Sequence, residues 1–429
     1  MKLSFKQKIL AKITPTEKEA LAQKTLARQL AEKILKHVHA KAMLVGSAAR
    51  DTGLRGDNDI DLFLLFPRKL SEKQIVSRTI KAVNTAIPVK WVMHYAEHPY
   101  LKATIEGFEV EVIPCFESKP HQGIKSAVDR SPLHMTYLQD RLTQNQREDV
   151  RLLKQLLKTN ELYGAELATQ GFSGLVCEYL ILNYRSLEEL IEAAAKWNPP
   201  VYINFTNEKI NQFKDSFVLI DAIDESRNAG AVVSETQLYR FISLCQKLVE
   251  KPAESFFEKK TIKKTTKKRK TIPLTISFAA PDLVEDILIP QLRKTERGLR
   301  KHLEHDYKII GTESVLNGKT AEIFLELENE FPPVVKKIIG PPANNSKAVK
   351  EFLKGKKPFR GPFIEGSRVI IEENTKQESI VSFLKKTLSK PSSFGCASHY
   401  EKTIRKARIT KNNKSNSAVK FYNKRDYWL

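Results

Sequence analysis

The alternation of apolar and polar residues along the chain predicts interleaved helices and strands near the N-terminus. Residues 15–38 carry apolar side chains at helical spacing, and Thr16 with Glu19 three residues later is typical of a capped helix start. Short apolar runs at 42–45 and 60–66 predict two buried strands. The chain therefore begins with elements of both kinds.

Three further segments complete this first pattern. Residues 71–86 predict a helix, and residues 91–98 predict a third strand. The segment 108–116 alternates so that Glu109 and Glu111 share one face and valines occupy the other. It predicts a strand whose polar face carries carboxylates.

From residue 141 onward the spacing of apolar residues becomes helical. The segments 149–164, 172–197 and 235–251 each favour a helix, which predicts a mainly helical middle domain. The stretch 259–270 follows, in which eight of twelve residues are basic and none is acidic. Its composition is typical of a linker or a loop.

The last third of the chain again mixes the two periodicities. Strands are predicted at 271–278, 320–328 and 367–373, and helices at 281–305 and 378–389. The final 29 residues contain nine basic residues and two acidic ones, together with several aromatic residues. Such a tail either stacks on RNA or docks on the protein.

These patterns predict a multidomain α+β protein. We expect domains at residues 1–140, 141–257 and 258–429, because a chain of 429 residues is too long for one core. No apolar segment is long enough to span a bilayer, and the N-terminus lacks the apolar stretch of a secretory signal. We expect a cytoplasmic protein that does not enter a membrane.

Charge narrows the class of partner. Lys and Arg outnumber Asp and Glu by 72 to 50, so the formal net charge is +22. Such a balance suits a polyanion, either nucleic acid or an anionic membrane surface. The four cysteines are far apart and show no metal-binding spacing, so we expect buried free thiols: Cys115, Cys177, Cys245 and Cys396.

The stretch 45–66, VGSAARDTGLRGDNDIDLFLLF, carries the clearest chemistry. Asp59 and Asp61 enter an extended segment two residues apart, so their side chains share a face about 6 to 7 Å apart. Paired carboxylates of this kind bind divalent cations, and oxygen ligands favour Mg²⁺. Glu111, on the other acidic strand, is the expected third ligand.

The first half of the same stretch favours phosphate. Gly46 permits close approach of the backbone, and Ser47 offers a hydroxyl where a strand turns into a short helix. Arg50, one helical turn later, can add a charge-assisted hydrogen bond. The two halves together predict a site for a metal-bound triphosphate.

This joint pattern, G-S-x-x-R followed by D-x-D and a later acidic strand, resembles the nucleotidyltransferase superfamily that includes DNA polymerase β. Further ordered segments resemble the archaeal-type, class I CCA-adding enzymes: YAEHPY (95–100), VEVIPC (110–115), IKSAVDRSPLHMTYL (124–138), VRLLKQLLK (150–158), ELYGAE (161–166), GFSGLVCEYLI (171–181) and DESRN (224–228). The resemblance covers residues 1–255 closely and is weaker beyond them.

The resemblance implies a fold and an activity. The fold would be a mixed-sheet nucleotidyltransferase palm with flanking helices, a helical domain that completes the nucleotide pocket, and an α+β RNA-binding domain with a basic tail. The activity would be template-independent addition of C, C and A from CTP and ATP to the tRNA 3′ end, with two Mg²⁺ ions. The resemblance does not determine the oligomeric state of this chain, and a homodimer is one option.

Residue roles follow from the resemblance by position in the motifs. The catalytic and metal-binding residues would be Asp59, Asp61 and Glu111. The nucleotide-binding residues would be Gly46, Ser47, Arg50, His134, Lys154, Tyr163 and Arg227. Taken singly, Lys154 favours a solvated lysine and Arg227 a surface ion pair, so their assignment depends on the order of the motifs.

Two positions depart from the family pattern. Asp51 stands where the family usually has glycine, and Glu111 stands where aspartate is common. A methylene moves a carboxylate by roughly 1 Å, and a misplacement of that size can cost about a hundredfold in rate. Three alternatives stay open. Another template-independent RNA polymerase such as a poly(A) polymerase and a small-molecule nucleotidyltransferase share the G-S-x-x-R and D-x-D pattern, and the two departures leave room for a catalytically lapsed tRNA-binding homologue.

Overall fold

The chain divides into two compact units, which are described separately. The first contains residues 1–260 together with 426–429, and the second contains residues 261–425. The predicted boundary at 140 falls inside the first unit, and the predicted domain limits stay predictions. The computed structural model describes residues 3–95, 98–119, 123–205, 213–259 and 270–429.

A five-stranded mixed sheet with the strand order β1-β2-β5-β4-β3 organises the N-terminal part of the first unit. Strands β2 and β5 are parallel, and every other neighbouring pair is antiparallel. The strands are β1 (Lys41–Val45), β2 (Asp59–Phe66), β3 (Val92–Tyr95), β4 (Pro99–Ile105) and β5 (Phe108–Phe116).

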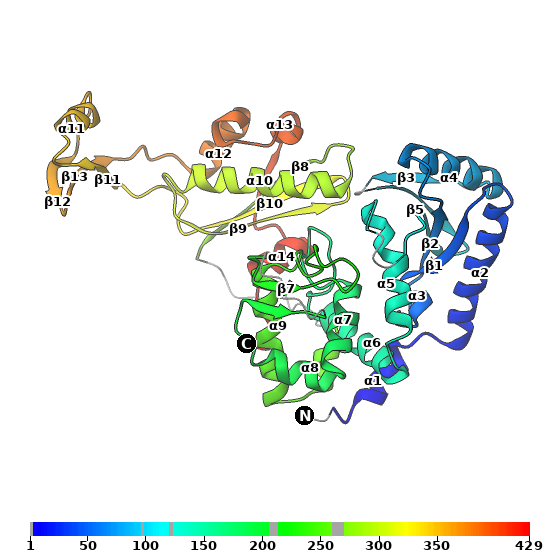
Figure 1. The fold of residues 1–429 in the computed structure, drawn as a ribbon. Helices are drawn as coiled ribbons and strands as arrows, with labels where there is room; N and C mark the ends of the chain where they lie inside the picture. The colour runs from blue at the N-terminus through cyan, green and yellow to red at the C-terminus, as the bar shows by residue number, and fades with distance from the viewer. Residues whose placement is uncertain (1–2, 96–97, 120–122, 206–212, 260–269) are drawn as a thin grey trace. The chain divides into compact units, whose positions relative to one another are not determined.

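The two faces of this sheet differ in what covers them (Figure 1). Helices α2 (Glu17–Leu35) and α4 (Glu72–Ala86) pack on the face that carries Ile60, Leu62 and Leu64 of β2. The opposite face carries Phe63 and Leu65, which pack with Met135 of α5. Because side chains alternate along a strand, Asp59 and Asp61 belong to this second face.

Two short elements accompany the second face. Helix α3 (Gly46–Arg50) follows β1 directly, and α5 (Arg130–Gln139) packs against both α3 and β1 after a short 3₁₀ turn at Ala127–Asp129. The expected helix after Gly46 is confirmed, although it ends at Arg50 because Asp51 adopts a left-handed conformation.

The predicted start of the first long helix is confirmed. The Thr16 side chain accepts from the Glu19 amide, and the Glu19 carboxylate accepts from the Thr16 amide, which forms a capping box. The helix spans Glu17–Leu35 and ends one turn before the predicted limit. The predicted strand 91–98 is shorter, and its residues 96 and 97 lie outside the described residues.

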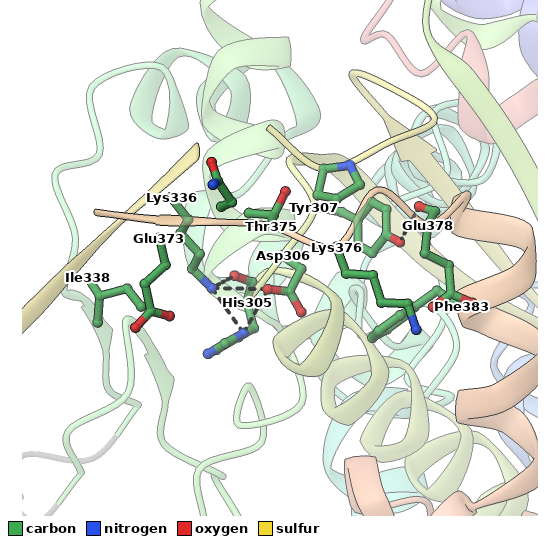
Figure 2. Close-up of a pocket in the computed structure, with 12 residues that line it drawn as sticks. His305, Asp306, Tyr307, Lys336, Ile338, Glu373, Thr375, Lys376, Glu378 and Phe383 are labelled. Atoms are coloured by element: carbon green, nitrogen blue, oxygen red, sulfur yellow. Dashed lines mark hydrogen bonds and ion pairs between the residues drawn. The ribbon is translucent and has the colours of Figure 1, made fainter. Parts of the chain in front are cut away.

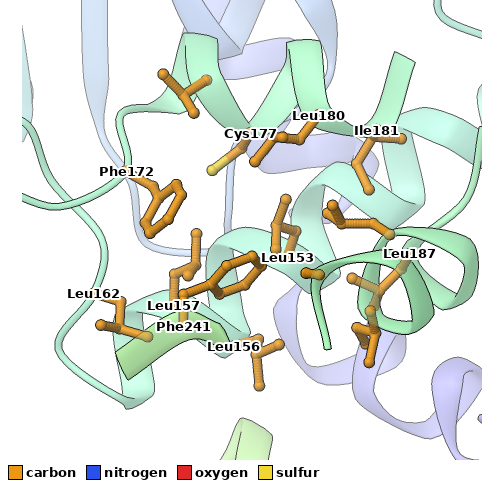
Figure 3. Close-up of a cluster of buried hydrophobic side chains, with 14 of the residues drawn as sticks. Leu153, Leu156, Leu157, Leu162, Phe172, Cys177, Leu180, Ile181, Leu187 and Phe241 are labelled. Atoms are coloured by element: carbon orange, nitrogen blue, oxygen red, sulfur yellow. The ribbon is translucent and has the colours of Figure 1, made fainter. Parts of the chain in front are cut away.

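Helices dominate the rest of the first unit, and their apolar side chains form one large core (Figure 3). Leucines of α6, Cys177 and Leu180 of α7, and Phe241 of α9 meet in it. The elements are α1 (Lys6–Ile13), α6 (Gln144–Thr159), α7 (Gly174–Tyr184), α8 (Leu187–Ala194), α9 (Glu235–Glu250), a 3₁₀ turn (Glu254–Phe257), and the parallel strands β6 (Val201–Ile203) and β7 (Phe217–Leu219).

The second unit contains a four-stranded antiparallel sheet in the order β14-β8-β10-β9, covered by helices. Its strands are β8 (Ile272–Ala279), β9 (Ile309–Asn317), β10 (Thr320–Leu327) and β14 (Arg408–Lys411). The helical elements are α10 (Glu285–Leu303), α12 (Ile380–Ser389), a 3₁₀ turn (Pro391–Phe394), α13 (Ser398–Ile404) and α14 (Asn416–Tyr422).

A second, three-stranded sheet in this unit has the order β11-β13-β12. Its strands are β11 (Val335–Pro342), β12 (Arg360–Glu365) and β13 (Arg368–Asn374), with α11 (Ser346–Leu353) beside β11. The five elements predicted from 271 onward are confirmed. In this unit, sequence reasoning missed seven helices and strands, each of which has at most two buried residues: β9, β11, β12, β14, α11, α13 and α14.

The aromatic residues of the tail pack on the protein. Phe421 stacks on Phe324 with ring centroids 5.7 Å apart, and the Tyr422 hydroxyl donates to the Leu274 carbonyl at 2.9 Å. Trp428 is buried in the helical core of the first unit. Docking on the protein therefore accounts for these side chains. The basic stretch 259–270 lies almost wholly outside the described residues.

All four cysteines are buried free thiols, as expected.

Candidate active site

The parallel pairing of β2 and β5 places the predicted carboxylates side by side. Asp61 lies opposite Glu111 in the register, and Asp59 lies opposite Glu109. All four side chains belong to the sheet face that α3 and α5 cover only in part. The sequence predicted the strands, and their pairing decides that the acids meet.

Gly46 fixes the approach of the backbone to Asp61. It has a φ of +78°, and a Cβ atom built on it would collide with the Asp61 carboxylate. Asp61 also lies opposite Val45 in the antiparallel pairing of β1 with β2. Gly46 and Asp61 are therefore in contact, and a larger residue would displace one of them.

The acids raise each other's affinity for protons. Burial, with repulsion from Glu111 and Asp59, raises the pKa of Asp61 to about 7. Burial and the neighbouring Asp57 also raise the pKa of Asp59. A set of oxygen donors in this electrostatic state suits a divalent cation, which removes the repulsion.

Lys102 supplies positive charge at this face and was missed by sequence reasoning. Its ammonium lies 2.5 Å from Glu109 and 3.3 Å from Glu111. Partial burial alone would lower the pKa of Lys102, but hydrogen bonds to these carboxylates raise it. Within the described part of the chain, no three acidic, His or Cys side chains are gathered closely enough to hold a metal ion.

Arg50 is buried and forms a two-point contact with Glu178 of α7. Its Nε donates to Glu178 Oε1 at 3.0 Å, and Nη2 lies 2.9 Å from Oε2. Ser47 is partly exposed in the first turn of the same short helix α3. The structure thus places Ser47 at the site, whereas the Arg50 guanidinium is engaged by a buried acid.

Lys154 joins the same buried network. Its ammonium donates to the Thr52 carbonyl at 2.9 Å and lies 3.3 Å from the Thr52 hydroxyl. That hydroxyl donates to Glu178 Oε1 at 2.6 Å. Burial lowers the pKa of Lys154, while the nearby Glu178 opposes the shift.

Tyr163 and Lys154 converge on the first residue of α7. A Cβ atom on Gly174 would lie 3.3 Å from the Tyr163 hydroxyl and 3.6 Å from the Lys154 ammonium. Burial raises the pKa of Tyr163, so its hydroxyl stays protonated at neutral pH. The phenol, the ammonium and the backbone of Gly174 thus form one polar cluster.

His134 and Arg227 are joined by an acid that sequence reasoning missed. His134 Nε2 lies 2.7 Å from Asp221 Oδ1, and Arg227 Nη1 lies 2.7 Å from Asp221 Oδ2. Asp221 is fully buried at the end of an apolar run. A single acid within an apolar segment, as at Asp221 and Glu178, is the sequence signal that marks both.

The predicted residues thus form three adjoining groups within the first unit. Gly46, Asp59, Asp61 and Glu111 lie on one sheet face, whereas the other two groups each assemble around a buried acid. Around Glu178 stand Arg50, Thr52 and Lys154, with Tyr163 beside them, and around Asp221 stand His134 and Arg227.

A cavity of about 220 Å³ in the second unit does not contain any of these residues (Figure 2). Lys336 crosses it and contacts Asp306 at 3.1 Å, and Tyr307 donates to the Glu378 carbonyl. Its lining mixes acids and bases, and the charged groups largely satisfy one another.

No helix in the described part of the chain is both long and apolar enough to cross a membrane.

Family models match three consecutive parts of the chain. Residues 24–134 match the nucleotidyltransferase domain, and residues 148–258 match the second domain of tRNA nucleotidyltransferase. Residues 269–412 match the C-terminal domain of the CCA-adding enzyme.

Relatives match over most of their length. The CCA-adding enzyme of Archaeoglobus fulgidus is 35% identical over 376 residues, which cover 84% of each chain. The CCA-adding enzyme of Methanosarcina mazei is 35% identical over 410 residues, covering 90% of this chain and 89% of the relative.

A solved structure of Cid1 poly(U) polymerase bound to MgATP aligns with a TM-score of 0.50 at 13% identity. The alignment covers 60% of this chain and 98% of that chain. At this identity the likeness shows the nucleotidyltransferase fold alone.

Proposed function

This chain belongs to the CCA-adding enzyme family of nucleotidyltransferases, and from that premise we propose which residues perform the addition of CCA to tRNA. Enzymes of this family act on tRNA with ATP and CTP. The register of β2 and β5 carries the proposal, because it brings Asp61 and Glu111 together on the face that Gly46 borders.

In this proposal Asp59 and Asp61 would hold two Mg²⁺ ions, with Glu111 as the third ligand. The raised pKa of Asp61 supports it, since a carboxylate that is buried beside other carboxylates favours a cation. Divalent ions bound there would supply Lewis-acid charge to the attacking 3′ hydroxyl and the departing pyrophosphate. Glu111 has to release Lys102 before it can join the two aspartates.

The nucleotide would lie beside this edge. Ser47 and the amides of α3 would face the triphosphate, and Lys154 and Tyr163, which meet beside Gly174 at the start of α7, would contact it as well. Arg50 stabilises the position of α3, which carries Ser47, because Glu178 binds its guanidinium. Asp51 does not oppose the phosphates directly, since its carboxylate pairs with Lys24 at 2.7 Å.

The tRNA would bind largely through phosphate contacts, in keeping with the net charge of +22. We place the enzyme in the cytoplasm, where its tRNA substrate is handled.

A primer-extension experiment tests the residue roles. The wild-type protein is incubated with MgCl₂, CTP, ATP and a tRNA lacking its 3′ CCA, and the products are sequenced. We expect CCA followed by a stop. Homopolymer tails would instead indicate another RNA polymerase, and tight binding without extension would indicate a lapsed homologue.

Asp61→Ala and Asp59→Ala should each abolish extension, by at least about a thousandfold, while tRNA affinity stays within about twofold. Glu109→Ala is the matched control, because Glu109 lies on the same face without an assigned ligand role. An active Asp61→Ala enzyme would refute the assignment. Glu111→Asp should keep or increase the rate.

A further inference from the structure

Asp221 connects two side chains that are far apart in the sequence. One oxygen, Oδ1, accepts from the Tyr179 hydroxyl at 3.1 Å and the Ile223 amide at 3.0 Å and lies 2.7 Å from His134 Nε2. The other oxygen, Oδ2, lies 2.7 Å from Arg227 Nη1. The carboxylate is fully buried, so these groups make up its surroundings.

The hydrogen bonds keep this buried acid ionised. Burial alone would raise the pKa of Asp221, but hydrogen bonds from His134, the Ile223 amide and Arg227 hold it well below its ordinary value. A buried anion shared by an imidazole and a guanidinium makes each of them depend on the other.

The turn that carries Arg227 is tied to α5 at two points. His134 holds Asp221 at the start of the turn, and Arg130, one helical turn earlier on α5, donates to Asp224 at 2.8 Å. Residues four apart on a helix share a face, so one face of α5 holds both acids. Met135 of the same helix packs on the sheet face that carries the catalytic carboxylates.

Arg227 differs from its partners in exposure. Its side chain is 37% exposed, whereas that of His134 is 7% exposed and that of Asp221 is fully buried. The guanidinium can therefore reach a substrate while one of its nitrogens stays on Asp221. If the guanidinium leaves Asp221, the carboxylate that His134 shares loses one of its hydrogen bonds.

We propose that Asp221 is a positioning residue that couples Arg227, which in this proposal contacts the base of the incoming nucleotide, to His134, which contacts its phosphates. The proposal rests on the nucleotide-binding roles that the resemblance to the CCA-adding enzymes implies for these two side chains. The base engages Arg227, and the shared carboxylate transmits that engagement to His134, which lies on the helix packed against the sheet that carries Asp59 and Asp61. A nucleotide whose base does not engage Arg227 leaves the coupling unused.

A double-mutant cycle tests the coupling. His134→Gln, Arg227→Lys and the double variant are compared with wild type by kcat/KM for CTP and ATP on tRNA ending before each addition. The fold-loss of kcat/KM in the double variant should be about tenfold smaller than the product of the fold-losses in the two single variants. Losses that multiply would overturn the proposal.

Asp221→Asn should remove the coupling. In the Asp221→Asn background, the losses of kcat/KM caused by His134→Gln and Arg227→Lys should therefore multiply. Asp221→Asn should also reduce the ratio of kcat/KM values by which the enzyme discriminates between CTP and ATP. Asp224→Asn is the matched control, because it removes a charge from the same turn without touching His134 or Arg227; it should leave the coupling intact. If Asp221→Asn and Asp224→Asn reduce the discrimination between CTP and ATP equally, the turn has only become less rigid in general, and the proposal is overturned. The double-mutant cycle with Asp221 unchanged tests the proposal even if Asp221→Asn does not fold.

A calorimetric measurement of CTP and ATP binding in MgCl₂ separates this proposal from the proposed function. If the losses of nucleotide affinity in His134→Gln and Arg227→Lys do not multiply in the double variant, the coupling is supported even when the wild-type protein does not extend tRNA. Extension of tRNA with fully multiplicative losses in both assays would leave the proposed function standing and reject the role of Asp221.

Discussion

Gly46 illustrates how one residue sets the geometry of the candidate site. Its positive φ lies in the region that glycine occupies at little cost, and the Asp61 carboxylate fills the space that a side chain would need. A substitution at Gly46 would therefore introduce both backbone strain and a collision with Asp61. Comparing Gly46 with Gly56, another glycine with a positive φ, separates the two effects.

Gly46→Ala should lower activity by about a hundredfold or more, because it displaces the Asp61 carboxylate by roughly 1 Å. Gly56 has a φ of +85° with open space around its Cα. Gly56→Ala should therefore cost about 1 kcal/mol of stability and leave kcat nearly unchanged. Steady-state kinetics and thermal unfolding of both variants check this, and equal losses of activity would contradict it.

Asp51 occupies the left-handed position at the end of α3, with φ 54° and ψ 43°. Glycine adopts this conformation at little cost, and aspartate tolerates it better than most other residues. The ion pair with Lys24 is half exposed, which limits its contribution to about 1 kcal/mol or less.

Asp51→Gly should change the free energy of unfolding by less than about 1 kcal/mol, because relief of strain offsets loss of the ion pair. Asp51→Ala keeps the strain and loses the pair, so it should be less stable than Asp51→Gly by about 1 kcal/mol. Urea unfolding measures both. A more stable alanine variant would show that strain at this position is unimportant.

At the scale of elements, α6 holds the loop between α3 and β2. Arg147, Arg151 and Lys154, three to four residues apart, donate to the carbonyls of Arg50, Gly53 and Thr52 respectively. This spacing puts the three bases on one face of the helix. Glu178 of α7 offsets part of the charge that Lys154 and Arg50 bring into the interior.

Glu178→Gln should lower the free energy of unfolding at pH 7 by about 3 kcal/mol, because it leaves Arg50 and Lys154 without their buried anion. Burial would raise the pKa of Glu178, but Arg50 and Lys154 hold it below the ordinary value. Its contribution is therefore complete above pH 4.5 and is lost as the pH falls through the lowered pKa.

The stability difference between wild type and Glu178→Gln should accordingly narrow as the pH falls below 4.5 in urea unfolding experiments. Glu189→Gln, at an exposed position of α8, should stay within about 0.5 kcal/mol of wild type throughout. A difference that does not vary with pH would mean that Glu178 is not ionised in the folded protein.

At the scale of the whole molecule, the last residues belong to the first unit although they follow the second in sequence. Trp428 is buried in the helical core, and Asp426 pairs with Arg240 of α9 at 2.8 Å. The chain therefore enters and leaves the second unit through the first, which ties the C-terminal residues to the stability of the helical part.

Trp428→Ala should destabilise the first unit by about 3 kcal/mol, because it empties a buried site of its largest side chain. Leu429→Ala is the control, since Leu429 is 88% exposed and should change stability by less than about 0.5 kcal/mol. Thermal unfolding followed by calorimetry resolves the effect. An unchanged transition in Trp428→Ala would show that the docked tail does not contribute.

Local pattern was enough to determine the acidic strands, the capped helices and the order of the motifs, because periodicity and capping act over a few residues. It also determined that Gly46, Asp59 and Asp61 belong to one stretch. What it could not determine was the partner of each charge. Packing brings Glu178 to Arg50, 128 residues away in the sequence, and Asp221 to His134, 87 residues away.

The tertiary structure decided those pairings for a physical reason. A buried charge has to be balanced by whichever opposite charge the fold brings within reach, and sequence distance does not restrict that choice. Strand register likewise decided that Asp61 faces Glu111. The sequence by itself thus predicted the candidate residues, and the packing decided which of them are held by another residue of the chain.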